Sequence, residues 1–402
     1  MRSYRIEEGP SCVIPTAAEV REASRERTDR RRAAGLTACP RGVFKLPNPR
    51  LDITDPVKEQ YVGLDLSKTS TMATAVDPFG HLIDQRKLGP TDKELLAFLH
   101  ALPAGRKHIV LEACNVWEHT YDAAASTGAD VLLANPLQAK LITKATLKTD
   151  KVDSEKLALL ARLDAVPESY ACPPEVRELR RLCRERYFYR GKWTAVANPT
   201  YAVLLQKGVP YEVGLLGRKR RREELRTREI PEVNRGLDVL VKLEEILQPL
   251  ENSLLEAFSK SKEAQLVATV PGVGPVTAMT LVAFLCPIER FDDLDAVVKY
   301  CGLCPSTSQS GEKSYSGHLV RDCNPLLKWV LIEAQWQTRR LEKKGDVAKV
   351  GRRVAKRGQA TDGAVAAARQ LVRICTSVLR RGTPYQPEAP GSSSRREGHA
   401  EP

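Results

Sequence analysis

Hydrophobic and polar residues alternate between residues 58 and 165 in a pattern that predicts strands interspersed with helices. Three consecutive strands are predicted from QYVGLDLS, TMATAVDPFG and HLIDQRKL, and the second of them closes on a Pro-Phe-Gly turn. The next predicted elements are a helix in DKELLAFLHAL, a strand in HIVLEA, a helix in WEHTYDAAASTG, a strand in DVLLAN and one further helix. This part of the chain is therefore predicted to be an α/β domain.

From residue 174 to residue 262 the pattern becomes helical and highly charged. Apolar residues recur at three- and four-residue spacing in EVRELRRLCRERYFYRGKW and again in RGLDVLVKLEEILQPLENSLLEAF. We expect two long helices that pack as an antiparallel or intermolecular coiled pair. The basic run GRKRRREELR lies between them, and it fits either a solvated surface or a contact with nucleic acid.

The stretch LVATVPGVGPVTAMTLVAFL opens the last predicted domain, which is mostly α-helical. Gly272 and Gly274 lie between two apolar helical stretches in it. This pattern is typical of a helix-hairpin-helix turn whose backbone amides bind a phosphate of nucleic acid. A plain αα-hairpin would show the same pattern.

The two ends of the chain lack such periodicity. Residues 1–57 are rich in arginine, and residues 384–402 are rich in Pro, Ser, Gly and Glu, so neither end can bury much apolar area. We expect a basic, mobile N-terminal arm and a disordered C-terminal tail. The predicted segments between them are an α/β domain at 58–165, a helical linker or oligomerisation segment at 166–262 and a C-terminal domain at 263–383.

Charge changes this picture because the 402 residues carry a formal net charge of +13. An excess of this size indicates a polyanionic partner, most often nucleic acid. There is no secretory segment and no apolar run near the roughly 20 residues that a membrane span needs, so we expect a soluble, cytoplasmic protein without a membrane partner. The ten cysteines have irregular spacing; Cys301 and Cys304 form one CxxC, but no second pair completes a zinc site, which favours buried thiols.

Four acidic residues form a candidate site. Asp65 lies in YVGLDLSK and Glu112 in HIVLEAC, each near the end of an apolar run, where a single carboxylate would also fit an exposed strand end. Asp150 and Asp153 are three residues apart in LKTDKVDSEKLALLAR and so share one face of a helix, although Thr149 or Asp150 could simply cap it. Together the four supply hard oxygen donors that could converge on two divalent cations, Mg²⁺ or Mn²⁺, for phosphodiester cleavage.

Six stretches carry a resemblance to a known family, in order and approximate spacing over about residues 58–345. They are VGLDLSK, LEA, KTDKVDSEKLA, VPGVGPVTAMTLVAFL, FDDLDAVVKYCGLCP and SGEKSYSGHLVRDCNPLLKWVLIEAQW. The predicted βββαβαβα order resembles the ribonuclease H-like fold, and the stretches resemble the DEDD transposases of the insertion-sequence-110 family, RNA-guided recombinases of bacterial mobile elements. The resemblance implies a RuvC-like nuclease domain with the four carboxylates as catalytic metal ligands, a coiled-coil segment and a transposase domain with a nucleophilic serine. It also implies a bridge RNA that pairs with donor and target DNA, homodimers joined into a tetramer, and a bacterial, nucleoid-associated location.

The family's Gly-Leu-x-Pro stretch, followed by four variable residues and Ser-Gly-x-Lys, corresponds here to residues 302–305, Ser310, Gly311 and Lys313. The resemblance therefore implies Ser310 as the nucleophile. The same Ser-rich loop, STSQSGEKSYS, also contains Ser306, Ser308 and Ser314, and without the resemblance it would be a flexible polar turn. A serine hydroxyl is a weak nucleophile, and we expect the carboxylate cluster and its metal to activate it. Three cations near it are expected to hold DNA phosphates: Lys313, Arg321 and Lys328.

Two departures from the family pattern are a glutamate, Glu312, in place of a small residue, and an N-terminal extension. Two other functions remain open from the residues alone. A metal-dependent junction resolvase or ribonuclease H-like nuclease would use the same carboxylates without a covalent intermediate and without the serine. A non-enzymatic helix-hairpin-helix DNA-binding protein would use the carboxylates only as caps.

Overall fold

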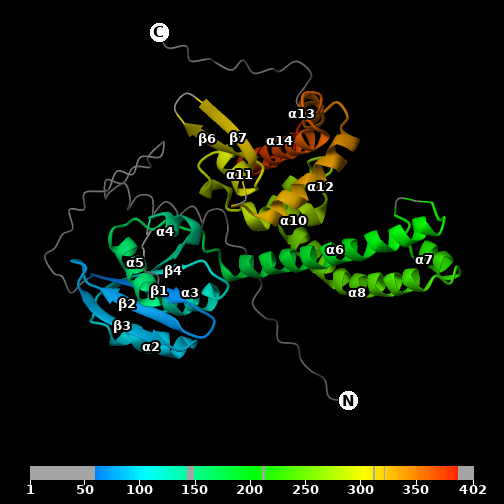
Figure 1. Cartoon of the computed structure of the whole chain (residues 1–402). Coiled ribbons are helices and arrows are strands. Elements are labelled where there is room, and N and C mark those ends of the chain that lie inside the picture. The colour runs from blue at the N-terminus through cyan, green and yellow to red at the C-terminus, as the bar shows by residue number, and fades with distance from the viewer. Residues whose placement is uncertain are drawn as a thin grey trace, which may run out of the picture. The chain divides into compact units, whose positions relative to one another are not determined.

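The structure is a computed structural model that describes residues 59–142, 149–210, 212, 214–310, 313–320 and 322–387, without the side chains of residues 307–310 and 313–316. The chain divides into two compact units, of which the first ends at Pro173 and the second begins at Pro174 (Figure 1). The arm predicted at 1–57 and residues 388–402 of the predicted tail lie outside the described residues. No helix in the described ranges is both long and apolar enough to cross a membrane.

The first unit is built on a mixed five-stranded sheet of order β3-β2-β1-β4-β5. Its strands are β1 (Glu59–Leu66), β2 (Thr71–Val76), β3 (Leu82–Leu88), β4 (Arg106–Glu112) and β5 (Asp130–Ala134). The strand β1 pairs antiparallel with β2 and parallel with β4, and β4 pairs parallel with β5. The predicted order of strands and helices is confirmed apart from one additional short helix, and the sheet is consistent with a ribonuclease H-like fold.

Helices cover both faces of this sheet (Figure 1). On one face, α2 (Asp92–Ala101) and α3 (Trp117–Ser126) close a core in which Phe98 packs with Val62 and Leu111 of the strands. The other face is covered by α5 (Asp150–Arg162). A short helix, α4 (Pro136–Ile142), precedes α5 and was not predicted, because its seven residues are too few to show a helical period.

The second unit opens with two long helices that pair within one chain. They are α6 (Pro174–Gln206) and α8 (Pro231–Lys260), joined through α7 (Lys219–Arg226). Arg186 contacts Glu251 at 2.7 Å and Trp193 contacts Glu244 at 3.1 Å, so residue numbers rise along α6 as they fall along α8. The two helices are therefore antiparallel. Buried residues of α8 recur at intervals of three, four and seven: Val233, Leu237, Leu240, Leu247 and Leu254.

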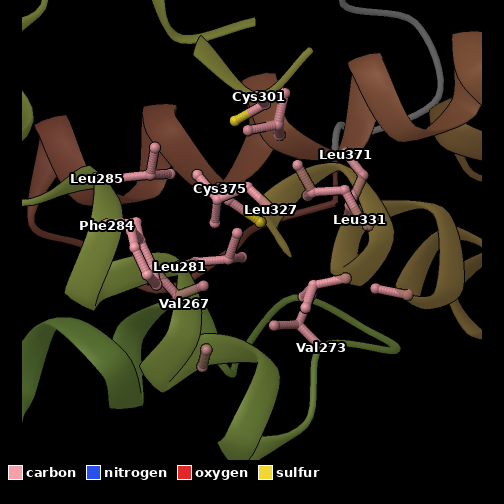
Figure 2. Packing of buried hydrophobic residues seen from close by; sticks show 14 of the residues in the cluster. Val267, Val273, Leu281, Phe284, Leu285, Cys301, Leu327, Leu331, Leu371 and Cys375 are labelled. Carbon is pink, nitrogen blue, oxygen red and sulfur yellow. The ribbon is translucent and has the colours of Figure 1, made fainter. Parts of the chain in front are cut away.

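The remaining elements form a mostly helical group around one apolar core. They are α9 (Lys262–Val267), α10 (Pro275–Leu285), η1 (Ile288–Arg290), α11 (Leu294–Tyr300), β6 (Pro305–Ser310), β7 (Lys313–Leu319), α12 (Pro325–Leu341), α13 (Asp346–Ala355) and α14 (Ala360–Arg381). Figure 2 shows Phe284 of α10, Leu331 of α12 and Cys375 of α14 among the side chains of this core. Burial raises the pKa of the Cys375 thiol to about 12, and it also raises the pKa of Cys301, so both thiols are neutral core residues.

The connection between α9 and α10 contains the two predicted glycines. Gly272 has a φ of +87°, and a Cβ on it would lie 2.4 Å from the backbone nitrogen of Thr338 in α12. Gly274 is the N-cap of α10 and would have no atom within 4 Å of an added Cβ. Close packing on α12 therefore explains Gly272, and a phosphate-binding helix-hairpin-helix turn stays a prediction.

The prediction of a loop at the Ser-rich stretch was wrong for the backbone. The strands β6 and β7 form an antiparallel hairpin in which Gln309 pairs with Ser314 and Ser310 pairs with Lys313. Its residues are almost all polar, so they do not show the apolar alternation that identifies a half-buried strand in a sequence. The segment is identified as a strand pair by its backbone pairing.

Candidate active site

Asp65 and Glu112 lie at the carboxyl ends of two neighbouring parallel strands. The register of β1 and β4 pairs Leu64 with Leu111, and each acidic residue comes one position later. Neighbouring strands are about 4.8 Å apart. The backbone therefore places these two acids side by side at one edge of the sheet.

Both acids also project from the same face. Val62, Leu64 and Leu111 belong to the core that α2 and α3 cover, and side chains alternate along a strand. Asp65 and Glu112 therefore project from the opposite face, which α5 covers. Both side chains are half-buried there, and each makes interactions with its surroundings.

The helix α5 is positioned by a glycine in the middle of β1. A Cβ on Gly63 would lie only 2.0 Å from the carbonyl oxygen of Ser154 and 2.5 Å from the nitrogen of Ala158, so the helix backbone contacts the strand directly. Further along the helix, Ala158 packs against Tyr61, two residues earlier in β1. The helix thus runs antiparallel to β1, and its N-terminus points toward the carboxyl end of that strand. A buried hydrogen bond of 2.8 Å between the Ser154 and Thr74 hydroxyls links it to β2.

This direction brings the first turn of α5 to the edge that carries Asp65. Of the two capping candidates, Thr149 is the N-cap, because its hydroxyl accepts a hydrogen bond of 3.3 Å from the Val152 N–H. Asp150 and Asp153 are the first-turn acids, where the positive end of the helix dipole favours a carboxylate. The helix cap therefore does not need either aspartate, and both remain available for another role.

The donor chemistry of the four acids fits a divalent cation, since carboxylate oxygens are the ligands that Mg²⁺ prefers. In the described residues, however, no three His, Cys, Asp or Glu side chains are arranged as a metal-binding group. Asp153 accepts a hydrogen bond of 2.8 Å from the ammonium of Lys156, one turn along the same helix. The backbone thus gathers the acids on one face and edge, while the side-chain conformation seen here directs Asp153 to a lysine.

Lys156 and Gly63 are two residues of the site that the sequence interpretation missed. Lys156 lies three residues after Asp153, a spacing that by itself predicts an ion pair on a helix. An isolated glycine inside a strand pattern signals a close approach of another backbone. Both signals are present in the sequence.

The serine candidates lie in the second unit, on the β6–β7 hairpin. Ser310 is the last residue of β6, and its backbone pairs with that of Lys313 at the start of β7. Its side chain, like those of Ser308, Lys313 and Ser314, lies outside the part of the chain whose side chains are described. The hydroxyl of Ser306 donates a hydrogen bond of 2.9 Å to the carbonyl of His318 and so helps to hold the hairpin.

The other predicted DNA-binding cations lie beyond the hairpin. Lys328 is in the first turn of α12, and its Cδ would be 3.4 Å from a Cβ on Gly302. Gly302 has a φ of +68° and would also place a Cβ 2.4 Å from the Cys323 sulfur, so a glycine is required here. Arg321 lies outside the described residues. The structure thus groups Lys328 with the turn that precedes the hairpin.

Two family models match the chain. Residues 62–208 match the DEDD transposase model of IS110 elements, and residues 264–348 match the model of the transposase IS116/IS110/IS902 family. The first range contains the four carboxylates, and the second contains Ser310 and the cations near it.

Three curated proteins, each a transposase or a protein of an insertion element by name, are similar to this chain. The transposase for insertion sequence element IS1111A of Coxiella burnetii is 24% identical over 282 residues, which are 67% of this chain and 75% of the relative. The putative transposase y4rJ of Sinorhizobium fredii is 30% identical over 217 residues, 47% of this chain and 54% of the relative. An uncharacterized 44.8 kDa protein of insertion element IS116 from Streptomyces clavuligerus is 24% identical over 155 residues, 38% of each chain. The similarity thus spans about half or less of the last two relatives.

Proposed function

Because the chain belongs to the IS110-related family of DEDD transposases, which makes it a DNA transposase, we propose that its first unit cuts DNA at a divalent-metal site formed by four carboxylates. These are Asp65, Glu112, Asp150 and Asp153. The observation that supports this most is the register of β1 and β4, which puts two of the acids side by side where the N-terminus of α5 approaches.

Each part of the chain has a separate task in this proposal. Bound Mg²⁺, or Mn²⁺ in its place, would stabilise the attacking and leaving oxygens of the phosphodiester. The sheet fixes the spacing of Asp65 and Glu112, and α5 brings Asp150 and Asp153 toward them. Lys156 neutralises part of the negative charge, and it can contact a DNA phosphate once Asp153 turns to the cation.

Removing one carboxylate tests this site. Asp65→Asn and Asp153→Asn are each expected to abolish DNA cleavage in magnesium, because an amide is a poor ligand for a hard cation, while the urea midpoint of unfolding stays close to that of the wild type. Asp84→Asn is the matched control, since Asp84 pairs with Arg86 on β3, away from the site. Full cleavage by Asp65→Asn, or by the wild type in excess chelator, would contradict the proposal.

The second part of the proposal is that Ser310 is the nucleophile of strand exchange. Its oxygen forms a bond to the phosphorus, the bond from phosphorus to one DNA oxygen breaks, and the serine proton ends on that leaving oxygen. The resulting ester conserves the energy of the phosphodiester until a new strand's hydroxyl attacks it and restores the serine. The match of residues 264–348 and the place of Ser310 beside Lys313 at the end of the hairpin support this role.

A covalent adduct distinguishes this chemistry from simple hydrolysis. Ser310→Ala should bind DNA and RNA like the wild type but give no protein–DNA adduct on a denaturing gel. Ser306→Ala is the control, because its hydroxyl is engaged with the hairpin backbone. An adduct with Ser310→Ala would assign the step to a neighbouring serine, Ser306, Ser308 or Ser314. Cleavage by the wild type without any adduct would favour the hydrolytic, resolvase-like mechanism.

The remaining expectations form the third part of the proposal. A bridge RNA selects donor and target DNA, the α6–α8 pair acts as a coiled coil that joins protomers into dimers and tetramers, and the α9–α10 turn contacts nucleic acid as a helix-hairpin-helix. The protein would then act at the nucleoid of a bacterial cytoplasm. Protein without RNA should protect no specific DNA sequence in a footprint, and protection of one sequence by RNA-free protein would reject the guide.

A further inference from the structure

The helix α13 is sharply divided into an apolar face and a cationic face. Val347, Ala348 and Gly351 are buried toward the rest of the unit. A Cβ on Gly351 would lie 3.1 Å from the carbonyl oxygen of Gly363, so α13 is pressed against α14, its neighbour in Figure 1. The opposite side of the helix and the turn that follows it carry five exposed cations, here named the α13 cationic face: Lys349, Arg352, Arg353, Lys356 and Arg357.

Most of these charges have no acidic partner. Lys349 pairs with Asp346 at 3.2 Å, whereas Arg352, Arg353 and Lys356 form no ion pair with any residue that the structure describes. A helix C-terminus favours one or two cations, but like charges three and four residues apart repel one another. The end of α12 and the connection that follows it add three more exposed cations without a described ion pair: Arg340, Lys343 and Lys344.

The basic run that the sequence analysis singled out behaves differently. Arg218 and Arg221 of that run both pair with Glu212. Arg226 pairs with Asp238 at 2.6 Å. These arginines are largely neutralised within the protein, which favours the solvated-surface alternative for α7. In contrast, Arg352, Arg353 and Lys356 of the α13 cationic face have no such acidic partner among the described residues.

We propose that the α13 cationic face binds the phosphate backbone of duplex DNA. The cations on the helix itself, from Lys349 to Arg353, extend over four residue steps, about 6 Å along its axis, and the B-DNA major groove, about 12 Å wide, admits an α-helix. The deep, narrow major groove of an RNA duplex does not admit a helix. None of the five side chains is aromatic, so the face lacks the aromatic side chains on which the bases of a bound single strand usually stack. This surface lies almost wholly beyond residue 348, where the second family match ends.

Two variants of the full chain with equal charge test this binding. Arg352→Gln, Arg353→Gln and Lys356→Gln are combined in one protein. Arg218→Gln, Arg220→Gln and Arg226→Gln are combined in the control, where each arginine has an acidic partner. Fluorescence anisotropy measures the affinity for a DNA duplex of unrelated sequence and for an RNA hairpin across a range of salt concentrations. Excess chelator is present, so the result is independent of the proposed metal site.

Each phosphate contact contributes about 0.9 to the slope of log affinity against log salt. The α13 variant should therefore lose on the order of 100-fold in DNA affinity near about 0.1 M salt, and its slope should fall by about 2 to 3. The control should change by less than about threefold, and the urea midpoint of both variants should match the wild type, because all the substituted side chains lie at the surface. Unchanged DNA affinity, or a loss of RNA affinity as large as the loss of DNA affinity, would overturn the proposal.

Discussion

Replacing Gly63 with alanine should separate α5 from the sheet and reduce DNA cleavage strongly. The added Cβ would lie 2.0 Å from the Ser154 carbonyl oxygen and 2.5 Å from the Ala158 nitrogen, and both of these are backbone atoms that cannot rotate away. Ordinary contact begins at 3.4 Å, so the helix must move by roughly 1.4 Å from the strand.

The movement affects function because the acids lie on both sides of the contact. Asp65 is on β1, whereas Asp150 and Asp153 are on α5. A misplacement of about 1 Å can cost on the order of 100-fold in rate, and overpacking of this kind costs about 1–3 kcal/mol of stability. We therefore expect a folded protein with a cleavage rate reduced by about two orders of magnitude.

The assay compares Gly63→Ala with Gly191→Ala. Gly191 lies on the exposed side of α6, and an added Cβ there would have no atom within 4 Å, so this control introduces the same methyl group without a clash. Urea unfolding gives the stability, and the initial rate of DNA cleavage at saturating magnesium gives the activity. A Gly63→Ala protein with the cleavage rate and urea midpoint of the wild type would refute the close contact between α5 and β1.

Two further predictions concern stability. Burial lowers the pKa of His108, but the nearby carboxylates of Asp130 and Glu59 outweigh it and raise the pKa above its usual value. The stabilisation of the folded state by protonated His108 is complete below the unfolded pKa and is lost as pH rises through the folded pKa. His108→Gln should therefore lower the free energy of unfolding by about 1–2 kcal/mol at about pH 5.5 and by less at about pH 9. An equal cost at both pH values, measured by urea unfolding, would contradict this. Leu240→Ala, at a fully buried position of α8, should lower the free energy of unfolding by about 2–5 kcal/mol. Leu255→Ala, at a position 44% exposed, should lower it by less than about 1 kcal/mol. Equal losses for the two variants would show that α6 and α8 are not packed as described.

The sheet and its acidic edge could be predicted from the sequence because both depend on local patterns. Short apolar runs identify β1 and β4, and parallel strands end at the same edge, so Asp65 and Glu112 are neighbours as soon as the strand order is known. The two long helices follow in the same way from three- and four-residue spacing. What this pattern cannot give is the distance at which α5 packs, which depends on the glycine contact with Ser154.

The ion pairs between different helices could not be predicted, because their partners come from distant parts of the chain, whereas local pairs such as Asp153 with Lys156 follow from their spacing. Arg226 of α7 meets Asp238 of α8, twelve residues later, and Arg186 of α6 meets Glu251, sixty-five residues later. In the sequence, α7 and α13 both carry a basic run. The fold shows that acidic residues pair with Arg218 and Arg226 of the first run, while Arg352, Arg353 and Lys356 of the second form no ion pair among the described residues.

This difference decides what the net charge of +13 means for DNA binding. A cation that already pairs with a carboxylate must break that pair before it can neutralise a phosphate, so it adds little to counterion release. An unpaired cation such as Arg352 or Lys356 carries no such cost. The salt dependence of DNA binding should therefore follow the number of unpaired cations on the contact surface, not the total of lysine and arginine. The arginines of α7, although more conspicuous in the sequence, should contribute less to that dependence than the shorter set on α13.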